Sequence, residues 1–381
     1  MRVIFWTEGF WPLIGGIPVL ATKLLLALRE RGYEVIVVAS QDFDGLPSEL
    51  RFEGIPIFRF PFLKALWKGN LDRVIELRQQ VAKLKRTFKP DLVHMNFIGL
   101  SAFFHLHTAA AHPASFLVTI HGALPGTSIN SDTLQRQTLC SADWVTCVSS
   151  AVLSEVCQKA PEIIPRSSLI FDGLDVPALP PEPLPRDKPR LLCVGRLGTE
   201  KGFDVALTAL ASLVDRFPHL RLVIAGDGPV LAELEERAAE LGLSDAVNFL
   251  GWVSPQKVPA LLNATTVVVV PSRQEGFSLV ALEAALMARP VVATRVGGLP
   301  EVVLHEQTGL LVEKEDSMAL AEAIAFLLDH PTTAGQMGQA ARRRAAEVFS
   351  WKRCVDAYDN LYQRLIKDGN RADSRDSPAG E

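Results

Sequence analysis

The chain has 381 residues, of which 48% are hydrophobic and 22% are charged, so it is long enough for two ordinary domains with their own cores. This composition is typical of a soluble globular protein. The formal net charge of −4 argues against a nucleic-acid-binding protein, which usually carries a basic excess.

The N-terminus predicts a strand rather than an export signal. The apolar run Val3–Trp6 breaks at Thr7, whereas a signal sequence needs roughly 7 apolar residues and a membrane span needs roughly 18. The five cysteines form an odd set without a CxxC spacing, which favours small buried residues over a disulfide frame or a zinc site. We therefore expect a cytoplasmic protein.

The first half of the chain alternates short β-branched runs with a longer helical pattern. A helix is expected over Pro18–Arg31, because apolar residues recur there with a helical period and Gly32 follows a basic last turn. This alternation is typical of a parallel sheet with crossover helices. The strands expected in this half are Val3–Trp6, Val35–Ala39, Asp91–His94, Phe116–Ile120 and Trp144–Val148.

A proline-rich segment over 177–189 is predicted to be a stiff linker, and the alternation restarts after it. Two doubly wound sheets joined in this way would aim the loops at the carboxyl ends of their strands into one cleft. Domains are therefore predicted over 1–176 and 190–350, with a final helix over 351–366 and a disordered tail over 367–381. The strands expected in the second half are Leu191–Gly195, Leu220–Gly226, Val247–Leu250, Val267–Val270 and Val291–Thr294.

The clearest candidate site is the loop 271–279, with Glu283 beyond it. A helix is expected to begin near Ser278, where free backbone N–H groups and the helix dipole suit a phosphate or a polyol. Eight residues of helix rise roughly 12 Å, whereas the carboxylate pairs of glycosidases lie roughly 5 to 9.5 Å apart. Glu275 and Glu283 are therefore better explained as contacts to the two ends of one long ligand, with a sugar at one end and a ribose at the other. For Glu283 alone, a solvated helix residue is an equal alternative.

Two cations follow the strand that ends at Gly195. Arg196 and Lys201 would lie at the carboxyl end of that strand, where they can hold a departing diphosphate as negative charge grows on it. In isolation, the same spacing would more commonly mark two solvated surface cations.

The first half contains three weaker signals. Gly15-Gly16 lets the backbone approach a ligand closely, although most such pairs are only turns and the G-x-G-x-x-G dinucleotide fingerprint is absent. His121 follows a strand, where it can bond a sugar hydroxyl or an acceptor. Asp42-Phe43-Asp44 has the form of a metal-binding motif but lies in a polar loop, so no metal site is predicted.

Together these residues resemble the retaining glycosyltransferases of family 4, which have the GT-B fold. The resemblance runs from the Gly15-Gly16 loop to Phe349-Ser350-Trp351. Each motif is weak alone, but their order and spacing together are specific. The motifs are Gly195-Arg196 with Lys201-Gly202, Gly226-Asp227-Gly228-Pro229, Glu275-Gly276-Phe277 through Glu283, and Gly297-Gly298-Leu299-Pro300-Glu301.

The resemblance implies two Rossmann-like doubly wound α/β domains facing each other across a cleft. It also implies retaining transfer of a hexosyl group from a nucleotide-diphosphate sugar to a glycan or lipid-linked acceptor, without a metal or another cofactor. The implied catalytic residues are Arg196 and Lys201 at the diphosphate, Glu275 at the transferred sugar and His121 near its C6 side. The implied donor-binding residues are Gly15, Gly16, Gly195, Phe277, Ser278, Leu279 and, at the ribose, Glu283.

Two positions depart from the family pattern, and both bear on donor preference rather than on the diphosphate grip. Asp172-Gly173-Leu174-Asp175 stands where Asn-Gly-x-Asp is frequent, and Ala288 stands where glycine is frequent.

The segment 64–89 is basic, with eight Lys or Arg against Asp72 and Glu76. Membrane-associated members of the family use such a surface to reach lipid acceptors, so peripheral contact at the inner membrane face is one interpretation. An ordinary amphipathic helix with a solvated face is the other. The apolar residues of the segment are Trp67, Leu71, Val74, Ile75, Val81 and Leu84.

Two alternative functions stay open. A non-hydrolysing nucleotide-sugar 2-epimerase would share the fold and need no acceptor, and a nucleotide-sugar-binding subunit would have lost turnover. The sequence leaves open the donor base and sugar, the acceptor, the linkage and the oligomeric state.

Overall fold

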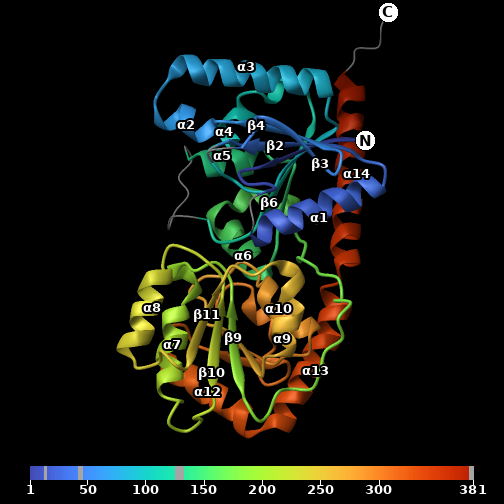
Figure 1. Ribbon diagram of the computed structural model, residues 1–381. Helices are drawn as coiled ribbons and strands as arrows, with labels where there is room; N and C mark the ends of the chain where they lie inside the picture. The colour runs from blue at the N-terminus through green and yellow to red at the C-terminus, as the bar shows by residue number, and fades with distance from the viewer. Residues whose placement is uncertain (13–14, 42–45, 125–132, 377–381) are drawn as a thin grey trace, which may run out of the picture. The chain divides into compact units, whose positions relative to one another are not determined.

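A computed structural model describes residues 1–12, 15–41, 46–124 and 133–376 (Figure 1). The chain divides into two compact units: unit 1 is Met1–Ile170 with Cys354–Glu381, and unit 2 is Phe171–Arg353. Each unit is a Rossmann-like α/β fold on a mostly parallel sheet, as the sequence predicts. The Asp42-Phe43-Asp44 motif lies outside the described residues.

The sheet of unit 1 has the order β3-β4-β2-β1-β5-β6-β7-β8, and its neighbouring strands are parallel except for β3 against β4. Its central strands are almost wholly buried and rich in Val and Ile, the pattern of a parallel sheet covered on both faces. The strands are β1 (Arg2–Thr7), β2 (Glu34–Ser40), β3 (Glu49–Phe52), β4 (Ile55–Phe60), β5 (Leu92–Met95), β6 (Ser115–Ile120), β7 (Trp144–Cys147) and β8 (Ser167–Leu169).

Helices α2 to α6 bury their apolar residues in one cluster with Ile4, Trp6 and Val38 of the sheet. Helix α1 begins at Gly16 and ends before Gly32, whose φ of 87° fits a glycine just past a helix C-terminus. The helices of unit 1 before its last segment are α1 (Gly16–Glu30), α2 (Phe62–Trp67), α3 (Leu71–Phe88), α4 (Ala102–Leu106), α5 (Leu134–Ser141) and α6 (Ser150–Lys159).

Helix α14 (Trp351–Asp376) returns the chain to unit 1, and it is drawn in red in Figure 1. The expected helix end at residue 366 is wrong, because the helix continues through most of the segment predicted to be disordered. The buried His94 lies 2.5 Å from the Tyr362 hydroxyl through Nδ1 and 2.7 Å from Thr119 Oγ1 through Nε2. Burial lowers the pKa of His94 to about 3, so a neutral imidazole joins α14 to the sheet.

The sheet of unit 2 has the order β11-β10-β9-β12-β13-β14, with all neighbouring strands parallel. The four valines of β12 are all buried, as befits a central strand. The strands are β9 (Arg190–Val194), β10 (Arg221–Ala225), β11 (Val247–Gly251), β12 (Val267–Val270), β13 (Val291–Thr294) and β14 (Gly309–Val312).

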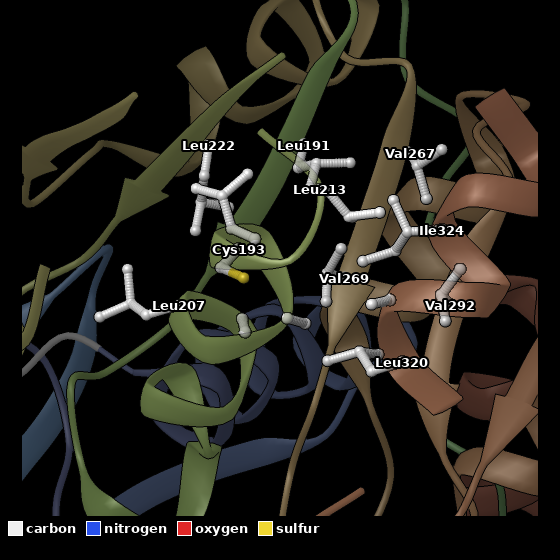
Figure 2. Close-up of a cluster of buried hydrophobic side chains, with 14 of the residues drawn as sticks. Leu191, Cys193, Leu207, Leu213, Leu222, Val267, Val269, Val292, Leu320 and Ile324 are labelled. Carbon is white, nitrogen blue, oxygen red and sulfur yellow. The ribbon is translucent and has the colours of Figure 1, made fainter. Parts of the chain in front are cut away.

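The core on one face of this sheet is drawn in Figure 2, where side chains of β9, β10, β12 and β13 meet those of α7 and α12. Helices α10 and α13 pack together and against strands of the same sheet. The helices of unit 2 are α7 (Phe203–Ala211), α8 (Leu231–Glu240), α9 (Val258–Asn263), α10 (Leu279–Leu286), α11 (Leu299–Val302), α12 (Ser317–Asp329) and α13 (Pro331–Val348).

The basic segment 64–89 forms two helices, α2 and α3, rather than one continuous pattern. Leu77 and Val81 face the core, whereas Leu71 and Ile75 are exposed, as is Trp67 at the end of α2. Among the described residues, no helix is long and apolar enough to cross a membrane.

Candidate functional site

The strand order of unit 2 reverses between β9 and β12. From β9 the chain proceeds outward through β10 and β11, and it then returns to β12 on the other side of β9. The chain therefore continues from β9 toward β10 and from β12 toward β13, in opposite directions from this point of the sheet. Ligands of open α/β sheets bind at such switch points.

Two glycines hold the loop after β12 tightly against its neighbours. Gly202 has a φ of 65°, and a Cβ built there would lie 2.1 Å from the Pro271 carbonyl oxygen. Gly297 has a φ of 50°, and its Cβ would lie 1.6 Å from the Glu275 carbonyl oxygen. No other residue fits either position, because the backbones already touch. Backbone N–H groups add to this contact, since Arg273 donates to Glu200 O at 2.8 Å and Gly298 donates to Glu275 O at 3.2 Å.

Lys201 and Glu275, predicted separately from two distant motifs, form an ion pair here. Lys201 Nζ lies 2.9 Å from Glu275 Oε2, and Ser272 Oγ donates to the same oxygen at 3.2 Å. The Glu275 side chain is 11% exposed and that of Lys201 is 26% exposed. A charge-assisted bond of this kind fixes the carboxylate in place while the ammonium keeps further N–H donors for a ligand.

Arg196 is held much more loosely. Its guanidinium lies 2.7 Å from Glu200 Oε1, and its side chain is 66% exposed. Exposed pairs of this kind contribute about 0.2–1 kcal/mol, so an incoming anion can displace the carboxylate at little cost.

Arg273 is a residue of this site that the sequence analysis missed. Its guanidinium bonds both carboxylate oxygens of Asp204, at 2.8 and 2.7 Å, and also pairs with Glu315. Burial alone would raise the pKa of Asp204, but the bonds from Arg273 lower it on balance. The same partners raise the pKa of Arg273. Arg273 thus ties the loop after β12 to the start of α7 and positions Glu275 indirectly.

Helix α10 begins where the sequence places it. Ser278 Oγ accepts the Ala281 N–H at 3.3 Å as an N-cap, which leaves the first N–H groups of the helix without intrahelical acceptors. Glu283 lies one turn after Leu279 on this helix. The Phe277 ring is buried against Phe171 and Phe349, so at this residue only the backbone is available to a ligand.

In unit 1 the strand order reverses between β1 and β5. Gly15 caps α1 in an extended conformation, and among the described residues a Cβ there would meet Pro18 alone, at 3.5 Å. Gly16 is the first residue of α1.

His121 follows β6 in the same unit. Its Nε2 lies 3.0 Å from Asn96 Oδ1, and burial lowers the pKa of the ring to about 4. The imidazole is neutral at pH 7, with Nε2 donating and Nδ1 left as an acceptor. Asn96 was not singled out from the sequence, although it directly follows β5 (Leu92–Met95) in the structure.

Glu8 is another residue without a sequence signal. Its Oε1 accepts the Ser101 N–H at 3.0 Å and its Oε2 accepts the Ser40 hydroxyl at 2.8 Å, so it joins the loop after β1 to the end of β2 and to the loop after β5. The described part of the chain holds no group of three or more His, Cys, Asp or Glu side chains placed to bind a metal.

Known proteins resemble this chain over nearly its whole length. Residues 178–344 match the family model described as glycosyl transferases group 1, and residues 14–176 match glycosyltransferase family 4. The chain is 32% identical over 392 residues to glycogen synthase of Mycobacterium tuberculosis (strain CDC 1551 / Oshkosh), spanning 95% of this chain and 94% of that protein.

Two further proteins extend the comparison. A GDP-mannose-dependent alpha-(1-6)-phosphatidylinositol monomannoside mannosyltransferase of the same organism is 29% identical over 92% of this chain and 95% of its own length. The crystal structure of Anabaena Alr3699/HepE in complex with UDP-glucose superposes with a TM-score of 0.78 at 21% identity, over 96% of this chain and 100% of that one, which shows the shared fold.

Proposed function

This chain belongs to glycosyltransferase family 4, and we propose that it transfers a hexosyl group from a nucleotide-diphosphate sugar to a glycan or lipid acceptor, with retention of anomeric configuration. The observation that carries this proposal is the Lys201–Glu275 ion pair at the switch point of unit 2, beside the N-terminus of α10. The Glu275 carboxylate can accept hydrogen bonds from sugar hydroxyls. The Lys201 ammonium and the helix N-terminus can bind a diphosphate.

We assign the leaving diphosphate to Arg196, Lys201 and the first N–H groups of α10. Negative charge grows on the β-phosphate as the bond to the sugar breaks, and preorganised donors stabilise that charge without a metal ion. The weak Arg196–Glu200 pair leaves Arg196 able to turn to the phosphate. Backbone groups of Gly195, Phe277, Ser278 and Leu279 and the carboxylate of Glu283 contact the rest of the nucleotide.

We propose that Glu275 of unit 2 contacts the hydroxyls of the transferred sugar. For unit 1 we propose that His121 serves the C6 side of the sugar and that Gly15 and Gly16 serve the phosphates. The neutral imidazole of His121 can accept a hydrogen bond from a sugar hydroxyl through Nδ1 while Asn96 fixes the orientation of the ring. The diphosphate oxygen, rather than a side chain, removes the acceptor proton on the same face of the sugar. This front-side route gives retention.

The first experiment is a screen of the purified protein against UDP-, GDP-, ADP- and TDP-hexoses by thermal shift and donor hydrolysis. One donor should raise the melting temperature and slowly yield free nucleoside diphosphate. R196A should lose donor hydrolysis but keep its fold. R237A is the matched control, because Arg237, like Arg196, is an exposed arginine paired with a nearby glutamate, Glu240. Normal turnover by R196A would refute the diphosphate assignment.

The same screen separates the alternatives. NMR of the product should show the anomeric configuration of the donor, and inversion would contradict the retaining route. A changed hexose released without any acceptor would identify a 2-epimerase. Donor binding without turnover, in the presence of a wide acceptor panel, would favour a binding subunit.

A lipid acceptor is favoured by the surface of α2 and α3. Trp67, Leu71 and Ile75 are exposed large apolar residues among lysines and arginines. Such a surface suits the boundary of an anionic membrane. We propose that the protein acts in the cytoplasm, where its five free cysteines stay reduced, and touches the inner membrane face through this surface. Flotation with anionic vesicles tests this, and W67A/L71A should abolish binding if the surface is used.

A further inference from the structure

Unit 1 contains a cavity of about 210 Å³ that lies away from the candidate site. It is bordered by α3, α4, the first residues of β6 and the segment before β7, at the amino ends of these strands. Gly15 and His121, by contrast, lie beyond the carboxyl ends of strands in the same sheet. The lining residues are Lys85, Val93, His105, Leu106, Ala109, His112, Ala114, Phe116, Ser141 and Asp143.

The inner end of the cavity holds a buried lysine. Lys85 lies on the core-facing side of α3, in line with Leu77 and Val81, and is only 2% exposed. Its Nζ lies 3.2 Å from His105 O and 3.3 Å from His105 Nδ1, and 5.9 Å from the centre of the Trp6 ring. These partners are all uncharged when His105 is neutral.

His105 is indeed held neutral. Burial, and then the charge of Lys85, keep the pKa of this imidazole well below its ordinary value. Within the described ranges, no carboxylate lies within ion-pair distance of Lys85. A buried ammonium without a counter-charge is costly, and burial accordingly lowers the pKa of Lys85 to about 7. An apolar helix residue would be the more stable choice for packing alone.

The outer end of the cavity meets the surface. Ser141 and Asp143 are exposed, and Asp143 Oδ2 accepts the Phe116 N–H at 2.7 Å. A wider hollow of about 820 Å³ shares His112, Ala114 and Asp143 as lining residues, so the cavity adjoins a depression through which a solute can enter. Between its two polar ends the walls are apolar, with Val93, Leu106 and Phe116.

We infer that this cavity binds a small organic anion, whose carboxylate or phosphate group pairs with Lys85. The anion would supply the missing negative charge beside Lys85. It would also accept a hydrogen bond from the third N–H of the ammonium, since His105 O and His105 Nδ1 accept only two. A polar group at its other end would face Asp143 and the solvent. The volume corresponds to on the order of seven water molecules and is below the size of drug-sized ligand sites, so nucleotide sugars are too large.

The test uses the full-length protein and measures its melting temperature against rising concentrations of phosphate, acetate, pyruvate and malate at constant ionic strength. At least one of these anions should raise the melting temperature of the wild type saturably. K85M should lose this rise, and in the absence of anions it should be as stable as the wild type or more so, because an apolar side chain replaces a buried charge. K83M is the matched control, since Lys83 is an exposed lysine on the same helix.

A second variant covers the case in which K85M fails to fold. A114L narrows the passage shared by the two hollows without touching the lysine, and it should weaken the apparent affinity at least tenfold. The proposal is overturned if no anion in the panel gives a saturable rise, which would leave Lys85 solvated by water. It is equally overturned if K85M or A114L keeps the wild-type response.

Discussion

Gly202 provides a sharp test of how the site is assembled. Its φ of 65° is left-handed, and a Cβ there would lie 2.1 Å from Pro271 O. In G202A that gap has to lengthen by about 0.9 Å to reach even 3.0 Å, the distance below which Cβ contacts are essentially never seen. Because Lys201 precedes this glycine and Glu275 follows Pro271, the substitution pushes the two partners of the ion pair apart.

The magnitude has two parts. A non-glycine residue in the left-handed region costs about 1–2 kcal/mol, and forcing extra atoms into a packed contact costs about 1–3 kcal/mol more. For a unit of this size, each kcal/mol lowers the melting temperature by about 2–4 °C. A displacement of about 1 Å at a reacting centre can cost about 100-fold in rate, so transfer activity should fall by about that factor.

The matched control is G242A. Gly242 has a nearly identical φ of 69° but nothing within 4 Å of its Cβ, so it carries only the backbone cost. Melting temperature and kcat for donor hydrolysis are measured for both variants. G242A should lose about 2–8 °C with normal kcat, whereas G202A should lose more stability and most of its activity. Equal behaviour of the two variants would refute the close packing of the loops after β9 and β12.

Three further outcomes are expected. K201M should reduce kcat by about 100- to 1,000-fold. The double variant K201M/E275Q should recover the melting temperature but not kcat, and a double-mutant cycle measures the coupling of the two residues. Y362F leaves Nδ1 of His94 without its partner and should cost about 1–3 kcal/mol in urea unfolding, whereas a loss equal to that of Y358F would contradict the special role of this bond. Because the unfolded chain protonates His94 near pH 6.5 but the folded one only near 3, His94 should lower the unfolding free energy by about 1.4 kcal/mol for each unit that the pH falls between those values. The buried His105 and His121 add to the measured slope, so H94N should remove only the part that belongs to His94.

The central strands could be predicted closely because burial on both faces leaves a continuous apolar run. The four valines of β12 are the clearest example, and their predicted range is confirmed. Strands β3, β4, β8 and β14 were not predicted. In β3 exposed and half-buried residues alternate, and β8 is half-buried throughout, so their short sequences resemble loops.

The motifs were enough to select individual site residues. They did not show which of these residues bond each other. Lys201 and Glu275 are 74 positions apart, and only the close contact of two loops shows that they bond each other. Arg273 stands inside a motif that was recognised, yet its bonds to Asp204 depend on where α7 begins. The sequence pattern of α3 also did not show which of its residues are buried, because tertiary packing decides this: Leu71 and Ile75 face solvent, whereas the charged Lys85 is buried.

The path of the chain through the two units has a consequence for biosynthesis. Unit 2 is one continuous segment, Phe171–Arg353, whereas unit 1 begins at Met1 and is completed only by residues from Cys354 onward. During synthesis, unit 2 can therefore finish folding while the sheet of unit 1 still lacks α14. A chain that ends before α14 leaves His94 without its Tyr362 partner. Unit 1 can therefore complete its packing only after α14 has been synthesised, later than unit 2.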